Sequence, residues 1–339
     1  MLTIYVTKDF DQMSQVAAAL AEDRIRACQA SQAECVLGLA TGNSPTGLYK
    51  HLAKAFNGKR IDARRVRSFN LDEYIGLPGK HAQERALNCN SYGYFMIAEF
   101  FALLREPFLE TSVPPGVLVE QADLVRALAA RPEHYALQGA SHGKAVVINE
   151  RATGYLRQIK ETILDAYQHN IEAAGGIDLQ IIGVGGRGHV AFHESGIPFA
   201  GNAMLLVQLD GNTIENAIRD GNFASKKACP HYAVSMSAQM VFKAGTVLLL
   251  ANGTRKTGPV AEALLGEVHS DVPLSYGQKY ALDGGEMLVV LDEAAAADLL
   301  QAPERLRAKG YTLVDLRAEP YVKVEDLHFA RDPKTNRMG

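Results

Sequence analysis

The sequence predicts an α/β protein built on a mainly parallel sheet with helices on both faces. Strand-like and helix-like patterns alternate along most of the 339 residues, which is typical of this class. With 47% hydrophobic residues and a formal net charge of −3, the chain can bury a sizeable core. We therefore expect a single α/β domain over residues 1–339.

The individual elements follow from apolar runs, helical periodicity and the turns between them. In chain order, we expect a helix over 10–30, a strand over 35–40, a helix from the turn 41–47 to 56, a strand ending in 69–74, a helix over 91–104, strands over 177–184 and 246–251, and a helix over 259–265.

Two regions depart from this alternation. Residues 114–154 contain two proline-bearing stretches and a Gly-Lys turn, and we interpret them as an insertion or lid and not as a second core. The tail over 293–339 begins with an alanine-rich helix and ends in polar residues, for which we expect fraying.

Composition excludes several classes of function. The near-neutral charge gives no basic surface for nucleic acid, and no apolar run reaches the roughly 18 residues of a membrane span. The N-terminus lacks the features of a signal peptide. The four cysteines have no metal-ligand spacing, which indicates reduced thiols, a cytoplasmic location and no metal site.

A glycine-rich segment over 183–194 follows the expected central strand. Its His189 and Glu194 are five residues apart on a loop at the carboxyl end of a strand, where open α/β sheets bind ligands. A neutral imidazole there can exchange protons near neutral pH. The alternative is a histidine that only satisfies loop carbonyls. Arg187 is the discordant residue of the segment.

A second loop, over 41–47, has small and hydroxyl residues at the start of a helix. Free backbone N–H groups and the positive end of the helix dipole favour an anion there, which indicates a phosphate cradle. The loop matches neither a Walker A nor a Gly-x-Gly-x-x-Gly motif, so no nucleotide is specified. The alternative is a capped turn with Pro45 at the first helical position. The residues concerned are Thr41, Gly42, Asn43 and Ser44.

Acidic and basic side chains complete the candidate site. Asp72 and Glu73 follow an apolar strand, where a partly buried Asp can act as a general base. Arg219 and Lys256 are the cations best placed for a phosphate. Adjacent acids and isolated cations are otherwise usually solvated. Because each loop follows a strand, we expect these loops to meet at one edge of the sheet.

Several of these motifs, in this order, resemble the glucosamine-6-phosphate deaminase (isomerase) family, within the wider group that includes 6-phosphogluconolactonases. The resemblance covers roughly residues 1–295 and depends on order and spacing. The motifs are Gly-Leu-Ala-Thr-Gly-Asn-Ser-Pro over 38–45, Phe-Asn-Leu-Asp-Glu-Tyr-Ile-Gly-Leu-Pro over 69–78, Ser-Tyr-Gly-Tyr-Phe-Met over 91–96, and the segment 176–194.

The resemblance implies a Rossmann-like three-layer α/β/α fold and conversion of an amino-sugar phosphate to a ketose phosphate and ammonia, with no metal or organic cofactor. It implies that His189 assists opening of the pyranose ring, supported by Glu194. It implies that Asp72 moves a proton between C1 and C2 of the open sugar. Glu73 is assigned to substrate binding. Ser44 with its turn, Arg219 and Lys256 match the phosphate-binding group.

The chain departs from the family pattern at several positions. Arg187 replaces an acid, and a cation there would favour the neutral imidazole of His189. His193 replaces an Asn and adds a second imidazole that could compensate. Asn88-Cys89 replaces a His-Pro pair, which predicts a different lid. Met204-Leu205-Leu206 replaces basic residues of allosterically activated members, so we expect no activation of that type.

The favoured function is therefore deamination and isomerisation of glucosamine 6-phosphate to fructose 6-phosphate and ammonia. The rivals are galactosamine 6-phosphate as substrate, hydrolysis of a 6-phosphogluconolactone, and a sugar-phosphate sensor that Arg187 has made inactive. The expected partner is the hexosamine 6-phosphate, with no nucleic acid and no membrane. The sequence leaves open whether the chain forms a homo-oligomer.

Overall fold

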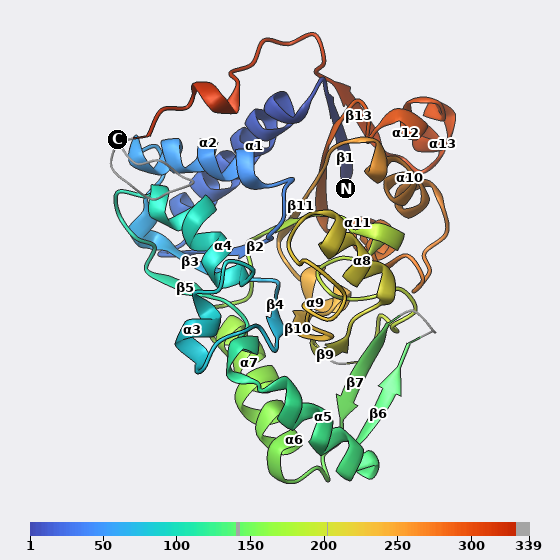
Figure 1. Cartoon of the computed structure of the whole chain (residues 1–339). Coiled ribbons are helices and arrows are strands. Elements are labelled where there is room, and N and C mark those ends of the chain that lie inside the picture. The colour runs from blue at the N-terminus through green and yellow to red at the C-terminus, as the bar shows by residue number, and fades with distance from the viewer. Residues whose placement is uncertain (140–142, 202, 330–339) are drawn as a thin grey trace.

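The computed structural model describes residues 1–139, 143–201 and 203–329, and a parallel sheet forms its centre (Figure 1). Within these residues eight strands pair in parallel throughout. Their order across the sheet is β13 (Thr312–Asp315), β1 (Leu2–Thr7), β12 (Glu286–Asp292), β11 (Thr246–Ala251), β8 (Leu179–Ile182), β2 (Cys35–Leu39), β3 (Val66–Asn70) and β5 (Glu110–Ser112). The predicted α/β fold class is confirmed.

Helices cover both faces of this sheet. Figure 1 shows α1 (Phe10–Ser31) and α2 (Thr46–Asn57) on one side and α10 (Thr257–Leu265), α12 (Ala297–Leu300) and α13 (Pro303–Ala308) on the other. The remaining helices are α3 (Ala82–Ala86), α4 (Tyr92–Glu99), α5 (Gln121–Ala130), α6 (Gly154–Ile159), α7 (Ala166–Ala173), α8 (Gly211–Arg219), α9 (Ala238–Val241) and α11 (Tyr276–Leu282). A π-helical segment, Lys160–Asp165, joins α6 to α7.

A second sheet, which the sequence did not reveal, is antiparallel. In the described part of the chain its strands are β4 (Asp72–Ile75), β10 (Tyr232–Met236), β9 (Met204–Gln208), β7 (Lys144–Ile148) and β6 (Tyr135–Gln138). A separate cluster of buried apolar side chains, including Phe192 and Val207, packs around it.

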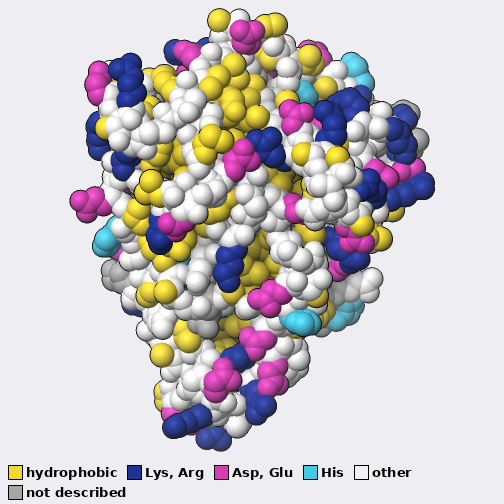
Figure 2. Space-filling view, turned by 180° about the vertical axis from the view of Figure 1, so that it is seen from behind, with side chains coloured by type: hydrophobic (Ala, Val, Ile, Leu, Met, Phe, Trp, Pro, Cys, Tyr) yellow, Lys and Arg dark blue, Asp and Glu magenta, His cyan; other side chains and the backbone are white. Residues whose placement is uncertain are grey.

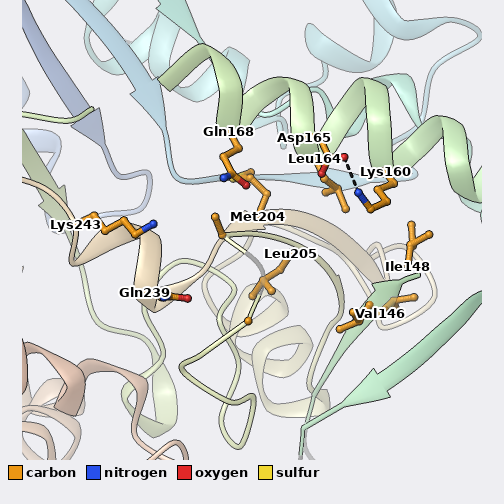
Figure 3. A pocket seen from close by; sticks show the side chains of 13 residues that line it. Val146, Ile148, Lys160, Leu164, Asp165, Gln168, Met204, Leu205, Gln239 and Lys243 are labelled. Carbon is orange, nitrogen blue, oxygen red and sulfur yellow. Dashed lines mark hydrogen bonds and ion pairs between the residues drawn. The ribbon is translucent and has the colours of Figure 1, made fainter. Parts of the chain in front are cut away.

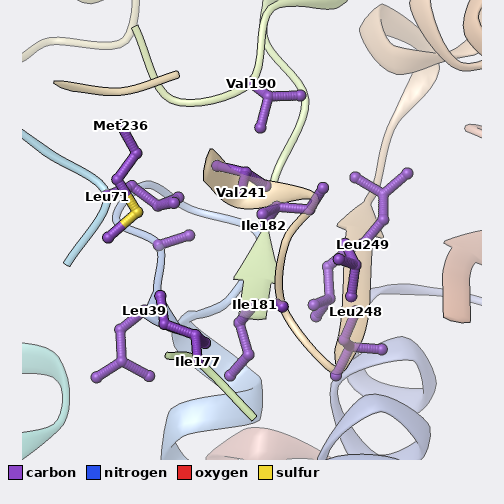
Figure 4. Close-up of a cluster of buried hydrophobic side chains, with 14 of the residues drawn as sticks. Leu39, Leu71, Ile177, Ile181, Ile182, Val190, Met236, Val241, Leu248 and Leu249 are labelled. Atoms are coloured by element: carbon purple, nitrogen blue, oxygen red, sulfur yellow. The ribbon is translucent and has the colours of Figure 1, made fainter. Parts of the chain in front are cut away.

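Leu71 is the junction between the two sheets. The sequence predicts one strand ending in 69–74, but β3 ends at Asn70 and β4 begins at Asp72 in the other sheet. The Leu71 N–H donates to the carbonyl of Leu39 (3.2 Å), and its carbonyl accepts from Met236 N–H (2.8 Å). Leu71 and Met236 lie side by side within the apolar cluster around β8 (Figure 4).

The predicted insertion, 114–154, is incorporated into the antiparallel sheet. Its β6 and β7 form a hairpin, and β7 pairs with β9. Together with α5 and α6 they form the lower end of the molecule in Figure 1. Its action as a lid stays a prediction, as does the single domain over 1–339.

The tail over 293–339 holds more regular structure than expected. After α12 and α13 the chain adds β13 beside β1, which makes β13 the edge strand of the parallel sheet. Beyond it, Tyr321 donates to Asp9 and Val324 N–H donates to Asp11 (3.0 Å), so the tail is fixed along α1. The polar end, 331–334, lies outside the described residues.

The surface view in Figure 2 shows positive and negative side chains interspersed over that face of the molecule. No helix within the described ranges combines the length and apolar character needed to cross a bilayer.

A cavity of about 220 Å³ lies between β7, β9 and the helical segment around the π-helix (Figure 3). Its lining is partly apolar, with Leu164, Met204 and Leu205, and partly charged, with Lys160 bound to Asp165 at 2.7 Å. The lining includes none of the residues expected in the candidate active site. The expected absence of activation through residues 204–206 stays a prediction.

Candidate active site

Four neighbouring strands of the parallel sheet, β11, β8, β2 and β3, precede the loops that carry the predicted residues. Hydrogen bonds join the loops after β2, β11 and β8. Ser44 Oγ, after β2, donates to Asn252 Oδ1, after β11, at 2.8 Å. Lys256 Nζ, also after β11, donates to the carbonyl of Val184, after β8, at 2.6 Å. The loops therefore meet at the carboxyl edge of the sheet, where such sheets bind ligands.

The imidazole of His189 faces the carboxylate of Glu194. Nδ1 of His189 lies 3.3 Å from Oε2 of Glu194, and their side chains are 16% and 2% exposed. The ring packs directly over Gly185, where a built Cβ would lie only 1.7 Å from Nε2. The absence of a side chain at Gly185 thus makes room for the imidazole.

Glu194 is held by the N-terminus of α8. Asp210 N–H donates to Oε1 at 3.1 Å, and Thr213 Oγ1 donates to Oε2 at 3.0 Å. Burial alone would raise the pKa of Glu194, but the hydrogen bonds from His189, Thr213 and the Asp210 backbone lower it below its usual value. Glu194 is therefore a carboxylate at neutral pH.

The predicted insertion also reaches this pair. A Cβ built on Gly143 would lie 2.6 Å from Cβ of Glu194, so the chain just before β7 packs tightly against the acid. A side chain at position 143 would displace Glu194 or the hairpin.

Asp72 is the first residue of β4 and is almost fully buried. Burial, with a contribution from neighbouring Glu73, holds the pKa of the Asp72 carboxyl well above its usual range. Among the described residues, its carboxylate has no hydrogen-bond donor. A carboxyl group of this kind keeps its proton to a higher pH than an ordinary Asp and can exchange it with a bound substrate.

Ser235 connects Asp72 to the glycine-rich loop. It pairs directly opposite Asp72 in the ladder between β4 and β10, and its Oγ accepts from Phe192 N–H at 2.9 Å. Cross-strand partners project from the same face of a sheet, so Asp72 and the segment 189–194 both adjoin Ser235.

Glu73 is engaged at the N-terminus of α4. Its carboxylate accepts from Ser91 Oγ (2.7 Å) and from the N–H groups of Tyr74 (2.9 Å), Tyr92 and Gly93 (both 3.1 Å). Burial nevertheless raises the pKa of Glu73 above its usual value. These contacts fix α4 beside β4, and a role of Glu73 in substrate binding stays a prediction.

The loop over 41–44 leaves the start of α2 open. Gly42 has φ 99°, a left-handed conformation that favours glycine. Pro45 occupies the cap position and no side chain caps the helix, so the alternative of a capped turn does not hold. Thr41 and Ser44 are half-buried, whereas Gly42 and Asn43 are exposed. Uncapped N–H groups at a helix N-terminus attract anions.

Lys256 and Arg219 differ in their surroundings. Burial, reinforced by neighbouring Arg255, lowers the pKa of Lys256. Arg219 ends α8, is exposed, and donates a hydrogen bond to Asn216 at 3.4 Å. The next residue, Asp220, reaches the turn after β11 by pairing with Arg255 at 2.9 Å. Lys256 is thus part of the loop cluster, while Arg219 lies beside it.

Arg187 faces Asp210. Its backbone is left-handed (φ 55°, ψ 22°), and its Nε lies 3.8 Å from Oδ2 of Asp210. Asp210 is buried and also caps α8 by accepting from Asn212 N–H at 2.9 Å. The carboxylate of Asp210 thus partly balances the charge of Arg187. The sequence did not indicate this acid.

His193 does not supply a second imidazole to the site. Its Nδ1 accepts from Ala238 N–H, and its Nε2 donates to the carbonyl of Ile197, both at 3.0 Å. Burial lowers the pKa of His193 to about 4. Both ring nitrogens are engaged with backbone groups, so the side chain is neutral and serves structure.

This burial predicts a pH-dependent stability. Between about pH 6.5 and about pH 4 the unfolded chain takes up a proton at His193 that the folded chain excludes, so the free energy of unfolding falls as the pH falls. The slope from this group approaches about 1.4 kcal/mol per pH unit. Urea unfolding of wild type and His193→Asn at several pH values should show a shallower slope for the variant. Exposed His169→Gln is the control, and equal slopes for wild type and His193→Asn would contradict the prediction.

Three residues of the site escaped the sequence analysis, namely Asp210, Thr213 and Ser235. An Asp followed by Gly-Asn-Thr has the pattern of a helix cap, so Asp210 and Thr213 carried a usable signal. Ser235 carried none, because its role arises from pairing between distant strands.

Two of the four cysteines meet away from the site. One ligand atom from each of Cys28, Cys35 and Asp178 lies within 4.8 Å of the other two. Within the described chain, no other three His, Cys, Asp or Glu side chains come together in this way. Asp178 already accepts from Val36 N–H at 2.8 Å. Burial raises the pKa of Cys28 to about 11 and that of Cys35 further, so both thiols hold their protons. We assign no metal to this group.

Proteins of assigned function resemble the chain over most of its length. A glucosamine-6-phosphate deaminase of Clostridium botulinum (strain Loch Maree) is 30% identical over 298 residues, covering 88% of this chain and 99% of that protein. One from Clostridioides difficile (strain 630) is 31% identical over 313 residues, covering 92% and 100%. No family profile matches the chain.

Solved structures show the same fold. A monomeric glucosamine-6-phosphate deaminase superposes with a TM-score of 0.64 at 24% identity, covering 87% of this chain and 99% of that one. The 6-phosphogluconolactonase from Trypanosoma cruzi gives 0.56 at 18% identity, covering 88% and 97%.

The fold defines the class first: an α/β protein with the fold that a glucosamine-6-phosphate deaminase and a 6-phosphogluconolactonase share. Within it, the chain belongs to the glucosamine-6-phosphate deaminase family, as its motifs predict.

Proposed function

We propose that this protein converts glucosamine 6-phosphate and water to fructose 6-phosphate and ammonia. The observation that carries the proposal is the arrangement of two proton-transfer groups at one sheet edge. His189 is paired with Glu194, and Asp72 is the cross-strand partner of Ser235, whose hydroxyl accepts a hydrogen bond from the same loop. Membership of the family supports this chemistry, because the relatives named above are glucosamine-6-phosphate deaminases.

His189 opens the pyranose ring in this proposal. With Nδ1 donating to Glu194, Nε2 is free to take the proton of the C1 hydroxyl and return it to the ring oxygen. The carboxylate of Glu194 stabilises the imidazolium that forms in between. Ring opening exposes the C1 aldehyde that isomerisation requires.

Asp72 then takes the proton from C2 and delivers it to C1. At the same time O1 gains the proton that the amino nitrogen loses, so the C2–N bond becomes an imine. Addition of water to the imine releases ammonia and leaves the C2 ketone. A buried carboxyl group with a raised pKa suits this role, because it must hold the proton between the two transfers.

The phosphate is assigned to the open N-terminus of α2, with Ser44 and Lys256 beside it. Arg219, at the end of α8, stays a predicted phosphate ligand. In this proposal, a fixed phosphate holds C1 and C2 between the two proton-transfer groups. Binding then orients the reacting atoms, which lowers the barrier. Cytoplasmic location and association with further copies stay predictions.

The test measures ammonia and ketose phosphate released from amino sugars by the purified chain, and the acid released from a lactone. The panel contains glucosamine 6-phosphate, galactosamine 6-phosphate and 6-phosphogluconolactone, with unphosphorylated glucosamine as control. We expect turnover of glucosamine 6-phosphate and none of unphosphorylated glucosamine. Preferred turnover of galactosamine 6-phosphate or of the lactone would reassign the substrate. Tight binding of the sugar phosphates by calorimetry without any turnover would favour the sensor.

A further inference from the structure

Thr213 contacts both members of the His189–Glu194 pair. Its Oγ1 lies 3.0 Å from Oε2 of Glu194 and 3.4 Å from Nδ1 of His189. Oε2 is thus shared by an imidazole and a hydroxyl, while Oε1 accepts from Asp210 N–H. Thr213 is 6% exposed and lies in the first turn of α8, so the helix backbone fixes the position from which its hydroxyl reaches Glu194.

The proton positions in this group follow from the charge of Glu194. A carboxylate only accepts hydrogen bonds, so both neighbours of Oε2 must donate to it. His189 therefore carries its proton on Nδ1, and the single hydroxyl proton of Thr213 is directed at Glu194. In the neutral imidazole this leaves Nε2 without a proton, and Nε2 is the atom that packs over Gly185.

Without the hydroxyl of Thr213, the carboxylate would lose one of its two side-chain donors. His189 would then be the only described side chain that donates to Oε2, and this single contact at 3.3 Å leaves Glu194 freer to turn away from the imidazole. The imidazole would lose the acceptor that fixes its tautomer, and the unprotonated nitrogen would no longer be held at one position.

We propose that Thr213 is a positioning residue, which orients Glu194 so that His189 presents an unprotonated Nε2 to the substrate. The inference rests on the proposed function, since it assigns a residue behind the ring-opening group. Thr213 itself touches neither the sugar nor its phosphate in this assignment. Its effect passes through Glu194 to His189.

Two substitutions separate the hydroxyl from the rest of the side chain. Thr213→Val keeps the shape and removes the donor, whereas Thr213→Ser keeps the donor. For Thr213→Val we expect kcat for glucosamine 6-phosphate to fall about 10- to 100-fold, with KM nearly unchanged. Thr213→Ser should retain most of the wild-type kcat. Thr162→Val, on an exposed helical position, is the matched control and should behave as wild type.

The pH profile gives a readout that mere loss of packing would not move. Removing a donor raises the pKa of Glu194, so the carboxylate becomes protonated at a higher pH and the acidic limb of kcat should move upward in Thr213→Val. Thermal unfolding of each variant establishes that it is folded at the assay temperature. Wild-type kcat and pH profile in Thr213→Val would overturn the proposal, as would equal losses in the Val and Ser variants.

A second measurement does not depend on turnover. Nitrogen-15 NMR of labelled protein should show His189 protonated at Nδ1 in wild type and Thr213→Ser, and a mixture of tautomers in Thr213→Val. If the wild type fails to turn over any substrate while these spectra appear as expected, the proposed function fails and the positioning of His189 stands. An unchanged tautomer in Thr213→Val refutes the positioning role.

Discussion

Replacing Asp72 with asparagine is expected to reduce kcat for glucosamine 6-phosphate by about 100- to 10,000-fold, the range for loss of a general base. The amide has nearly the shape of the carboxyl group but cannot take the proton from C2. Binding of the sugar phosphate should persist, because the phosphate is assigned to the loop after β2 and to Lys256 after β11. Asp72 follows a different strand, β3.

The measurement pairs steady-state kinetics with calorimetric binding of fructose 6-phosphate. Asp23→Asn, an exposed acid on α1, is the control for removal of a negative charge. Because burial raises the pKa of Asp72, the carboxylate becomes protonated at a higher pH than an ordinary Asp. As the pH is lowered, wild-type turnover should therefore begin to decline at a correspondingly higher pH. Undiminished turnover in Asp72→Asn would show that Asp72 is not the base.

Gly185→Ala is expected to reduce kcat by about 100-fold, because a misplacement of about 1 Å in a catalytic group can have that effect. The new methyl group would lie 1.7 Å from Nε2 of His189, so the imidazole must move. The backbone of Gly185 has φ −89°, which alanine adopts readily. The substitution therefore acts on the imidazole and not through backbone strain.

Gly183→Ala is a matched control in the same loop. A Cβ built on Gly183 has nothing within 4 Å, so we expect wild-type kcat from it. Equal kcat values for the two variants would refute the close packing of His189 on Gly185. A fall in both would indicate that the loop tolerates no side chain, whatever its contact with the imidazole.

The parts of the site that the sequence predicts are those fixed by strand ends. His189, Asp72, Ser44 and Lys256 each follow a strand of one parallel sheet, and parallel strands deliver their loops to a common edge. The α/β class and most element positions follow from the same periodicity. The catalytic and binding roles of these residues remain proposals.

What the sequence could not predict depends on pairing between distant segments. The antiparallel sheet is assembled from β4, β10, β9, β7 and β6, which come from widely separated parts of the chain. Glu73 looks like a second acid of the site until α4 is placed against it. His193 looks like a spare imidazole until Ala238 and Ile197 occupy its two nitrogens.

Leu71 limits how the two sheets can move. Its N–H is bonded to β2 and its carbonyl to Met236 on β10, so rotating one sheet against the other at this point breaks a buried backbone hydrogen bond, at about 1–3 kcal/mol. Asp72, the next residue, is therefore fixed relative to both. The far edge of the antiparallel sheet is less constrained, because within the described chain β6 pairs with β7 alone. We expect any closure around a substrate to pivot at this edge. The two proton-transfer groups would then keep their separation.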